Sequence, residues 1–169
     1  MKTLLFRSLL TLIIFSCMDS PDQKYSPIVS LQIHDLIKDS LLNIRALEIE
    51  DNRIRAVSAI GDSYSVDLRT NKVYVNRVNV DTINFRASAI VNNNYFTLSI
   101  GNPAYLFRDT ELVYKETHPN IFYDALHFWN SMEGVAIGDP VDGCMSILIT
   151  RNGGTTWNKV SCEVLPSSI

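Results

Sequence analysis

The chain has 169 residues, of which 46% are hydrophobic and 20% are charged, so it is long enough for one ordinary domain with a packed core. Its formal net charge is -3 at pH 7. No cluster of Lys and Arg occurs, which argues against nucleic acid as the partner. Long helical periodicities are scarce and asparagine is frequent, a balance that favours an all-β protein.

The first residues are typical of an export signal. Lys2 and Arg7 give a positive start, and the apolar run Leu9–Phe15 is too short to span a bilayer. The run leads into Ser16 and Cys17, which resembles a bacterial lipobox, so residues 1–17 are expected to form a lipoprotein signal with Cys17 as the lipidated residue. The alternative is a plain signal peptide with an incidental cysteine. Residues 18–27 are polar and are expected to form a tether.

Strand-like segments begin at Ile28. The first predicted strand is Ile28–Ile33, and Asn43–Glu50 then alternates apolar and polar residues with a period of two. Arg55–Ile60 follows the turn-like Asp51-Asn52.

An internal repeat then indicates the architecture. Its best-marked segments are Ala59-Ile60-Gly61-Asp62, Ser99-Ile100-Gly101-Asn102 and Ala136-Ile137-Gly138-Asp139, whose glycines are 40 (61 to 101) and 37 (101 to 138) residues apart. We expect each glycine to end the second strand of its repeat, because glycine allows a positive φ or a close approach. Asp62, Asn102 and Asp139 are then expected to mark the turns. Upstream of these segments lies a second echo, made of Ile44-Arg45-Ala46, Phe85-Arg86-Ala87 and Tyr123-Asp124-Ala125.

Each repeat also contains candidates for a third and a fourth strand. These are Tyr64–Leu68 and Lys72–Val75, Tyr105–Phe107 and Leu112–Tyr114, and Met145–Ile149 and Trp157–Val160. A period near 40 residues with about four short strands is the length of one blade of a β-propeller. We place the repeats at about residues 41–78, 83–116 and 121–162, within a domain of residues 28–169.

The third repeat contains a predicted hairpin turn. Asn152-Gly153-Gly154 lies between two apolar runs, and Asn and Gly accept the positive φ that tight turns demand. The pattern resembles the Asp-box, or BNR repeat, of sialidase-type propellers, a structural motif whose positions are filled here by Thr150, Asn152, Gly154, Thr156 and Trp157. Asn152 stands where Asp is usual, and its side chain can still accept the hydrogen bonds of the turn.

These residues together resemble a known family. The stretch 122–157, with Phe128-Trp129, Gly134–Gly143 and the Asp-box-like turn, is similar to the photosystem II stability/assembly-factor-like propellers, and in particular to non-photosynthetic, Bacteroidetes-type envelope homologues that are often labelled oxidoreductase. The similarity covers about Leu41 to Val160. It implies a seven-bladed propeller with an assembly or scaffold role. The chain holds about three blades, so it is expected to be a partial propeller and a truncated member, because three blades cannot close a ring.

We expect no catalytic residue, metal site or cofactor. His34, His118 and His127 are far apart and not at ligand spacing. The chain lacks a Gly-x-Gly-x-x-Gly after a strand, a Cys-x-x-Cys and a haem-attachment motif, so its residues do not support an oxidoreductase activity. Sialidases add an arginine triad and a Tyr with an acid partner, and no motif fixes three arginines in one pocket here. Asp139 and Asp142 can serve as an acid–base pair, but their sequence is first of all that of a turn.

Arg45 and Arg86 are the candidate partner-binding residues. They occupy equivalent places in successive repeats, so they are expected to point in equivalent directions, near the axis or at one face. The alternative is a pair of solvated or stacking arginines. The leading hypothesis is a lipid-anchored scaffold of the bacterial cell envelope that binds a protein or a glycan without chemistry of its own. The alternative is a sialidase-like glycan hydrolase or a nominal oxidoreductase.

Cys144 and Cys162 are a candidate disulfide, because the envelope is a compartment in which disulfides persist. If the hairpin turn centres on Gly153, Ile149 pairs with Trp157, and the same register brings the two cysteines opposite each other. The alternative is two free thiols, since a bulge in the hairpin would misalign them.

Overall fold

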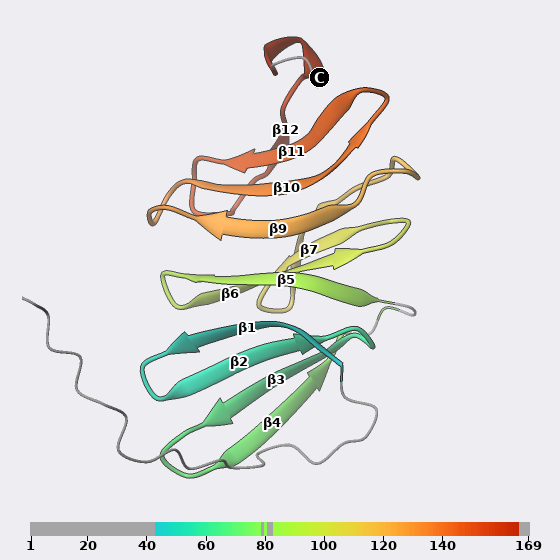
Figure 1. Cartoon of the computed structure of the whole chain (residues 1–169). Helices are drawn as coiled ribbons and strands as arrows, with labels where there is room; N and C mark the ends of the chain where they lie inside the picture. The colour runs from blue at the N-terminus through green and yellow to red at the C-terminus, as the bar shows by residue number, and fades with distance from the viewer. Residues whose placement is uncertain (1–42, 79, 81–82, 166–169) are drawn as a thin grey trace, which may run out of the picture. The chain divides into compact units, whose positions relative to one another are not determined.

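The computed structural model describes residues 43–78, 80 and 83–165. The export signal, the tether and the predicted strand Ile28–Ile33 lie outside these residues. The described chain forms three antiparallel sheets followed by a short 3-10 turn, Cys162–Val164 (Figure 1). Among the described residues, no helix has the length and apolar character that crossing a bilayer requires.

Each sheet has four strands, and each strand pairs with the next one along the chain. The first sheet contains β1 (Ile44–Glu50), β2 (Arg53–Ser58), β3 (Asp62–Asp67) and β4 (Lys72–Arg77). The second contains β5 (Asn84–Val91), β6 (Asn94–Ile100), β7 (Tyr105–Arg108) and β8 (Glu111–Lys115). The third contains β9 (Tyr123–Phe128), β10 (Gly134–Val141), β11 (Cys144–Thr150) and β12 (Asn158–Lys159). The prediction of three four-stranded antiparallel sheets is confirmed.

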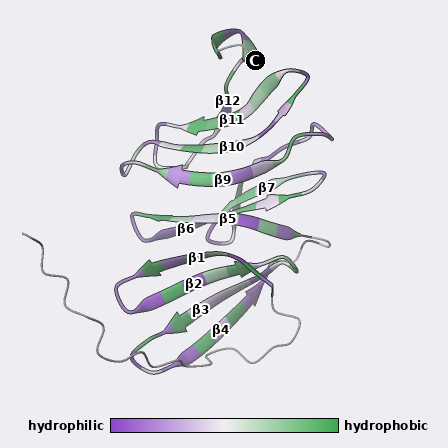
Figure 2. Ribbon diagram, viewed as in Figure 1, coloured by the Kyte–Doolittle hydropathy of each residue, from purple (hydrophilic) through white to green (hydrophobic). Residues whose placement is uncertain are grey.

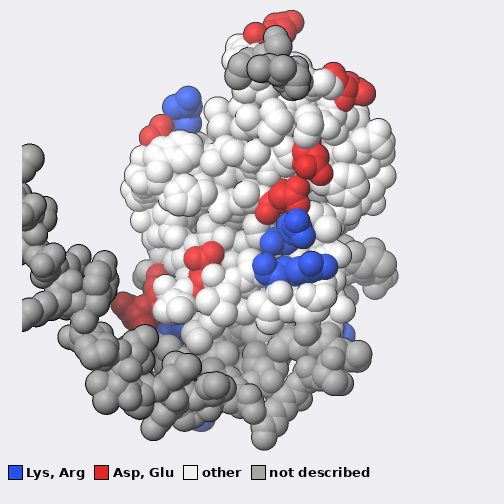
Figure 3. Space-filling model, viewed as in Figure 1, with Lys and Arg blue, Asp and Glu red and all other residues white. Residues whose placement is uncertain are grey.

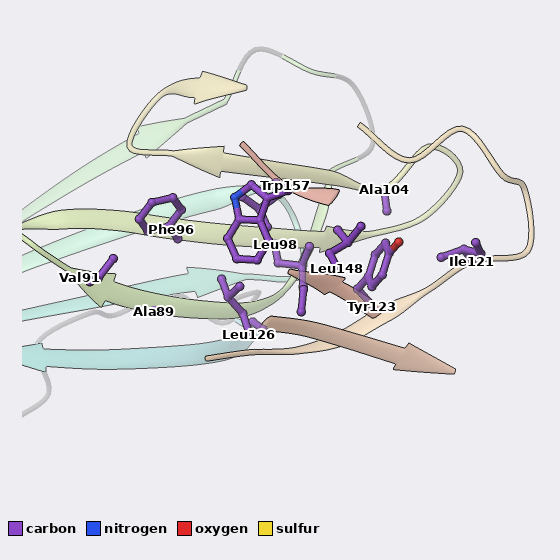
Figure 4. Close-up of a cluster of buried hydrophobic side chains, with 13 residues drawn as sticks. Ala89, Val91, Phe96, Leu98, Ala104, Ile121, Tyr123, Leu126, Leu148 and Trp157 are labelled. Atoms are coloured by element: carbon purple, nitrogen blue, oxygen red, sulfur yellow. The ribbon is translucent and has the colours of Figure 1, made fainter. Parts of the chain in front are cut away.

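The sheets pack through apolar faces. Polar and apolar residues alternate along strands such as β3, whose burial also alternates (Figure 2). Between the first and second sheets, Val57 packs with Phe85 and Phe107. The larger core lies between the second and third sheets, where Phe96, Leu148 and Trp157 are almost fully buried (Figure 4). Because successive side chains of a strand point to opposite faces, each sheet can contribute to two such layers.

A β-bulge lies near the start of the first strand of every sheet. In β1, Ile44 pairs with Ser58 and Ala46 with Val57, so Arg45 is the extra residue. Arg86 of β5 and Asp124 of β9 are extra in the same way. The second echo of the sequence is therefore a repeated bulge, which releases one side chain per sheet from the regular pleat. We call Arg45, Arg86 and Asp124 the bulge column.

The three repeat glycines do not share one role, so that part of the prediction is wrong. Gly101 follows β6 directly with a φ of +124°, and Gly61 has a φ of +84° but lies beyond the end of β2 at Ser58. Gly138 lies inside β10, where a Cβ atom would overlap the carbonyl oxygen of Phe122. Glycine is required there by a close approach of backbone and not by a turn.

The polar residues after these glycines also differ from one another. Asn102 lies in the β6–β7 turn, in a cis peptide bond to Pro103. Asp62 begins β3, and Asp139 lies within β10. Only the residue after Gly101 therefore marks a turn as expected. In the first repeat Asp62 belongs to the third strand of its sheet, and in the third repeat Asp139 belongs to the second strand.

Candidate functional site

The bulge column lies along the first strands of the three sheets. β1 contacts β5 and β5 contacts β9, so equivalent positions on these strands follow one another. Arg86 donates from Nε to Asp124 Oδ1 over 2.8 Å, and their side chains are 41% and 38% exposed. Figure 3 shows basic and acidic side chains side by side near the middle of a mostly uncharged face. Arg45 and Arg86, which the sequence places at equivalent positions, are thus both the extra residue of a β-bulge.

Arg45 differs from Arg86 in one respect. Its side chain is exposed, and it has no hydrogen bond or ion pair within the part of the chain that the structure describes. A guanidinium presents five N–H donors in a planar fork that matches a carboxylate. Arg45 is therefore available for an outside acceptor. The sequence does not indicate Asp124 as a site residue, although it aligns with Arg45 and Arg86 in the repeated three-residue segment.

A partly buried carboxylate lies on the same strands. Glu48 of β1 accepts a hydrogen bond over 3.3 Å from the hydroxyl of Ser88 in β5. Burial raises the pKa of Glu48, while the Ser88 bond and the charge of His127 oppose the rise. The first two sheets thus meet along their first strands through a polar contact.

The Thr150–Trp157 turn is held by its own side chains. Thr150 Oγ1 accepts from the backbone N–H of Gly154 over 2.9 Å, and Asn152 Oδ1 accepts from that of Thr156 over 2.9 Å. Trp157 donates from Nε1 to the carbonyl of Gly154 over 3.2 Å, and its ring packs in the core beside Phe96. Every one of these groups is used inside the turn or the core, so the turn anchors the end of the third sheet.

A Tyr/Glu pair exists, but it is buried. Glu116 is 5% exposed and Tyr123 is 0% exposed. Glu116 Oε2 accepts from Tyr123 over 2.9 Å and from Tyr114 over 3.1 Å, while Oε1 accepts from two backbone N–H groups. Burial, and then the bond to Glu116, raise the pKa of Tyr123 far above its ordinary value. The nearest cation in an ion pair with Glu116 is Lys159, at 3.8 Å. These groups fasten the β8–β9 connection and offer no surface to a glycan.

No protein-family model and no curated protein sequence matches this chain. Solved structures do resemble it. It superposes on "YCF48 bound to D1 peptide" with a TM-score of 0.54 and 9% identity, over 70% of this chain and 39% of that one. It superposes on the WD40 repeats of RRP9 with a TM-score of 0.52 and 11% identity, over 72% and 39%. For the computationally designed protein Ika4 the TM-score is 0.53 and the identity 14%, over 78% and 79%.

The chain folds as part of a β-propeller. Its three sheets are blades, and β1, β5 and β9 are their equivalent first strands. The chain spans about two fifths of the length of the first two of these propellers, 39% in each case.

A disulfide joins Cys144 to Cys162 in the third blade, with their Cα atoms 5.5 Å apart. The predicted register of the hairpin is wrong by one residue. Ile149 pairs with Asn158 and not with Trp157, because the turn between β11 and β12 includes Trp157. The chain leaves the strand after Lys159, and Cys162 begins the 3-10 turn, which brings its sulfur to Cys144 despite the shifted register.

The described acidic and histidine residues are not gathered into a cluster of metal ligands. Within residues 43–78, 80 and 83–165, no group of three His, Cys, Asp or Glu side chains is placed to hold a metal ion. Asp139 donates its backbone N–H to Phe122 over 3.1 Å, and Asp142 has a φ of +53° in the β10–β11 turn. Both residues therefore have a local structural role in this blade.

Proposed function

We propose that this chain is a binding scaffold that recognises an extended acidic segment of a partner protein along the bulge column. The observation that carries the proposal is the open guanidinium of Arg45, next in line to the Arg86–Asp124 ion pair. A segment with a carboxylate can take a bidentate pair of hydrogen bonds from Arg45. One structure of similar fold is described as "YCF48 bound to D1 peptide", which supports peptide binding as a mode for the fold.

An acidic peptide array tests this proposal. Hexapeptides with free and with amidated C-termini are incubated with the full chain, and binding is followed by fluorescence anisotropy. Arg45→Glu is expected to weaken the best peptide by at least about tenfold, since it replaces an attraction by a repulsion. The matched control is Arg53→Glu, an exposed arginine at the β1–β2 turn. Equal affinity of the Arg45 variant and the control would refute the role of the bulge column.

The same proposal includes a lipid anchor at Cys17 and a location on the cell envelope. It is supported by the sequence around Ser16-Cys17 and by the disulfide, which suits an oxidising compartment. Cys17→Ala is expected to move the expressed protein out of the membrane fraction or to block its processing. Retention and processing like those of the parent chain would contradict the anchor.

We also propose that Thr150–Trp157 is an Asp-box and that the chain is related to the photosystem II assembly-factor-like propellers. The hydrogen bonds of Thr150 and Asn152 within the turn support the first statement. A glycan-hydrolase function finds no corresponding support. The Tyr/Glu pair is enclosed, and Arg55, Arg77, Arg86, Arg108 and Arg151 are each ion-paired to a separate carboxylate. Incubation with a fluorogenic sialoside, which should release no dye, checks this.

A further inference from the structure

A cleft of about 250 Å³, lined by both polar and apolar side chains, lies between the first and second blades. Its walls include Arg55 of β2, Ser63 and Ser65 of β3, and Thr97 of β6. The alternation of side chains explains the set: Arg55 pairs with Ser65, and both turn towards the second blade. Phe85, which is fully buried, adds an apolar part to the wall.

The equivalent position between the second and third blades is filled by aromatic side chains. Counted from the bulges, Arg55 opposite Glu48 corresponds to Phe96 opposite Ala89. Phe96 packs against Phe128, with ring centroids 4.9 Å apart, and against Trp157. Ser63 corresponds in the same way to Leu106, which is 0% exposed. Two core positions of the second blade are thus polar in the first, which packing alone does not favour.

Some polar groups of the cleft make no hydrogen bond to a described residue. Arg55 Nε is buried and donates no hydrogen bond to any described residue. Thr97 is 2% exposed, and no hydrogen bond of its hydroxyl to a described residue is present. Ser63 and Ser65 are half-buried and Asn76 is exposed, and their side chains also make no hydrogen bond to a described residue. A buried polar group without a partner destabilises the fold. A ligand that forms hydrogen bonds with such groups therefore binds with a favourable free energy.

The cleft offers one guanidinium with open N–H donors, that of Arg55, to an acceptor of modest size. Two guanidinium groups and one carboxylate line it: Arg55, Arg77 and Asp109. Arg77 is already held by Asp62 through two bonds of 2.6 and 2.9 Å. Arg55 lies 3.6 Å from Asp109, too far for a hydrogen bond, with its guanidinium 5.3 Å from the centre of the Tyr95 ring. Arg55 is therefore oriented by the ring and still has free donors.

We propose that this cleft binds a single sugar acid, with the ligand carboxylate on Arg55 and the ligand hydroxyls on Thr97, Ser63 and Ser65. The cleft is smaller than the roughly 300–1,000 Å³ of pockets for drug-sized ligands, which limits the occupant to about one sugar ring. A carboxylate satisfies the guanidinium, and a polyhydroxylated ring satisfies several hydroxyl side chains at once. The site is independent of Arg45 and of the partner proposed above.

Titration of the full chain with D-glucuronate, followed by calorimetry and by NMR saturation transfer, tests the site. We expect weak, saturable binding, with glucose at least about tenfold weaker because it lacks the carboxylate. Arg55→Gln is expected to reduce the affinity for glucuronate by at least about tenfold. Thr97→Val, which keeps the shape and removes the hydroxyl, is expected to reduce it by about fivefold and guards against misfolding of the first variant.

The matched control is Arg69→Gln, an exposed arginine outside this cleft, which should leave the affinity unchanged. Absence of glucuronate binding, or binding that neither Arg55→Gln nor Thr97→Val weakens, would overturn the proposal. Equal affinity for glucose and glucuronate would overturn the assignment of the carboxylate to Arg55.

Discussion

At the scale of single residues, Glu116 shows how one buried carboxylate can organise a connection. It accepts from Tyr114, Tyr123 and the backbone N–H groups of Thr117 and His118, so four donors depend on one side chain. The sequence does not predict this role, because Glu116 belongs to neither of the two repeated segments, the one around the glycines or the three-residue segment upstream. Arg55 was missed for the same reason: only the three-dimensional comparison with Phe96 shows that it occupies a core position.

We predict that Glu116→Ala lowers the free energy of unfolding by about 3 kcal/mol, because it leaves buried donors without an acceptor. Glu116→Gln keeps one acceptor oxygen and should cost about 1 kcal/mol. Urea denaturation followed by tryptophan fluorescence measures both. The control is Glu111→Ala, whose carboxylate pairs with Arg108 at the surface; a loss as large as that of the Glu116 variant would contradict the argument.

Glu116 should also make the free energy of unfolding depend on pH in the acid range. Burial alone would raise the pKa of Glu116, but its hydrogen bonds, with His118 first, and the charge of Lys159 bring the pKa below its ordinary value of 4.5. A carboxyl whose pKa is lowered by folding stabilises the fold above its ordinary pKa, and this stability is lost as the pH falls through the folded value. The unfolding free energy should therefore decline below about pH 4.5. In Glu116→Gln the decline should be shallower, and identical pH profiles would be evidence against this role.

At the scale of elements, the sequence predicted the order of the described strands well, because most of them are short runs with apolar residues between turn residues. It predicted their ends less well. The repeated Gly-Asp/Asn pair looks like one turn signal, yet Gly138 is needed inside a strand for the approach of Phe122. The sequence showed the bulges only as a repeated three-residue segment. A bulge itself is defined by the pairing of two strands, so the sequence of one strand does not predict it.

Gly138→Ala is predicted to destabilise the third blade by more than about 2 kcal/mol, since its methyl group would overlap backbone and not a flexible side chain. Gly143→Ala is the matched control. A Cβ there meets nothing within 4 Å, and the only cost is a φ of +77°, about 1 kcal/mol. Thermal unfolding by circular dichroism compares them, and a larger loss for Gly143→Ala would be inconsistent with the close approach.

The Cys144–Cys162 disulfide closes a loop of sequence separation 18. By the chain-entropy model, its removal is expected to lower the free energy of unfolding by about 3 kcal/mol. The double variant Cys144→Ser/Cys162→Ser and the reduced parent chain should show similar losses. Adding reductant to the double variant should change nothing further. Two reactive thiols in the exported, denatured parent chain would show that the bridge does not form.

At the scale of the whole molecule, the blades stack by presenting one face to each neighbour, and the third blade has a further face that is only partly covered. Val135, Ile137, Ile147 and Ile149 share this face by their strand register, and Ile137 is 38% exposed. An apolar sheet face of this kind favours association. The repeat in the sequence predicted several blades, but it does not reveal which faces remain uncovered.

We predict that the 169-residue chain self-associates at micromolar concentration and that Ile137→Asp shifts it towards the monomer. Sedimentation velocity measures the distribution. Thr155→Asp, an exposed position in the β11–β12 turn, is the control for added charge alone. A parent chain that sediments as a monomer at all concentrations would disprove the prediction.

The bulge column has a consequence for how such a protein can change over generations. A bulged residue has no partner across its own sheet, so replacing it disturbs no cross-strand pair. Arg45, Arg86 and Asp124 already show both signs of charge at one backbone position. Natural selection can therefore vary the charges on this face one blade at a time, while the cross-strand pairs of the sheets keep their sequence.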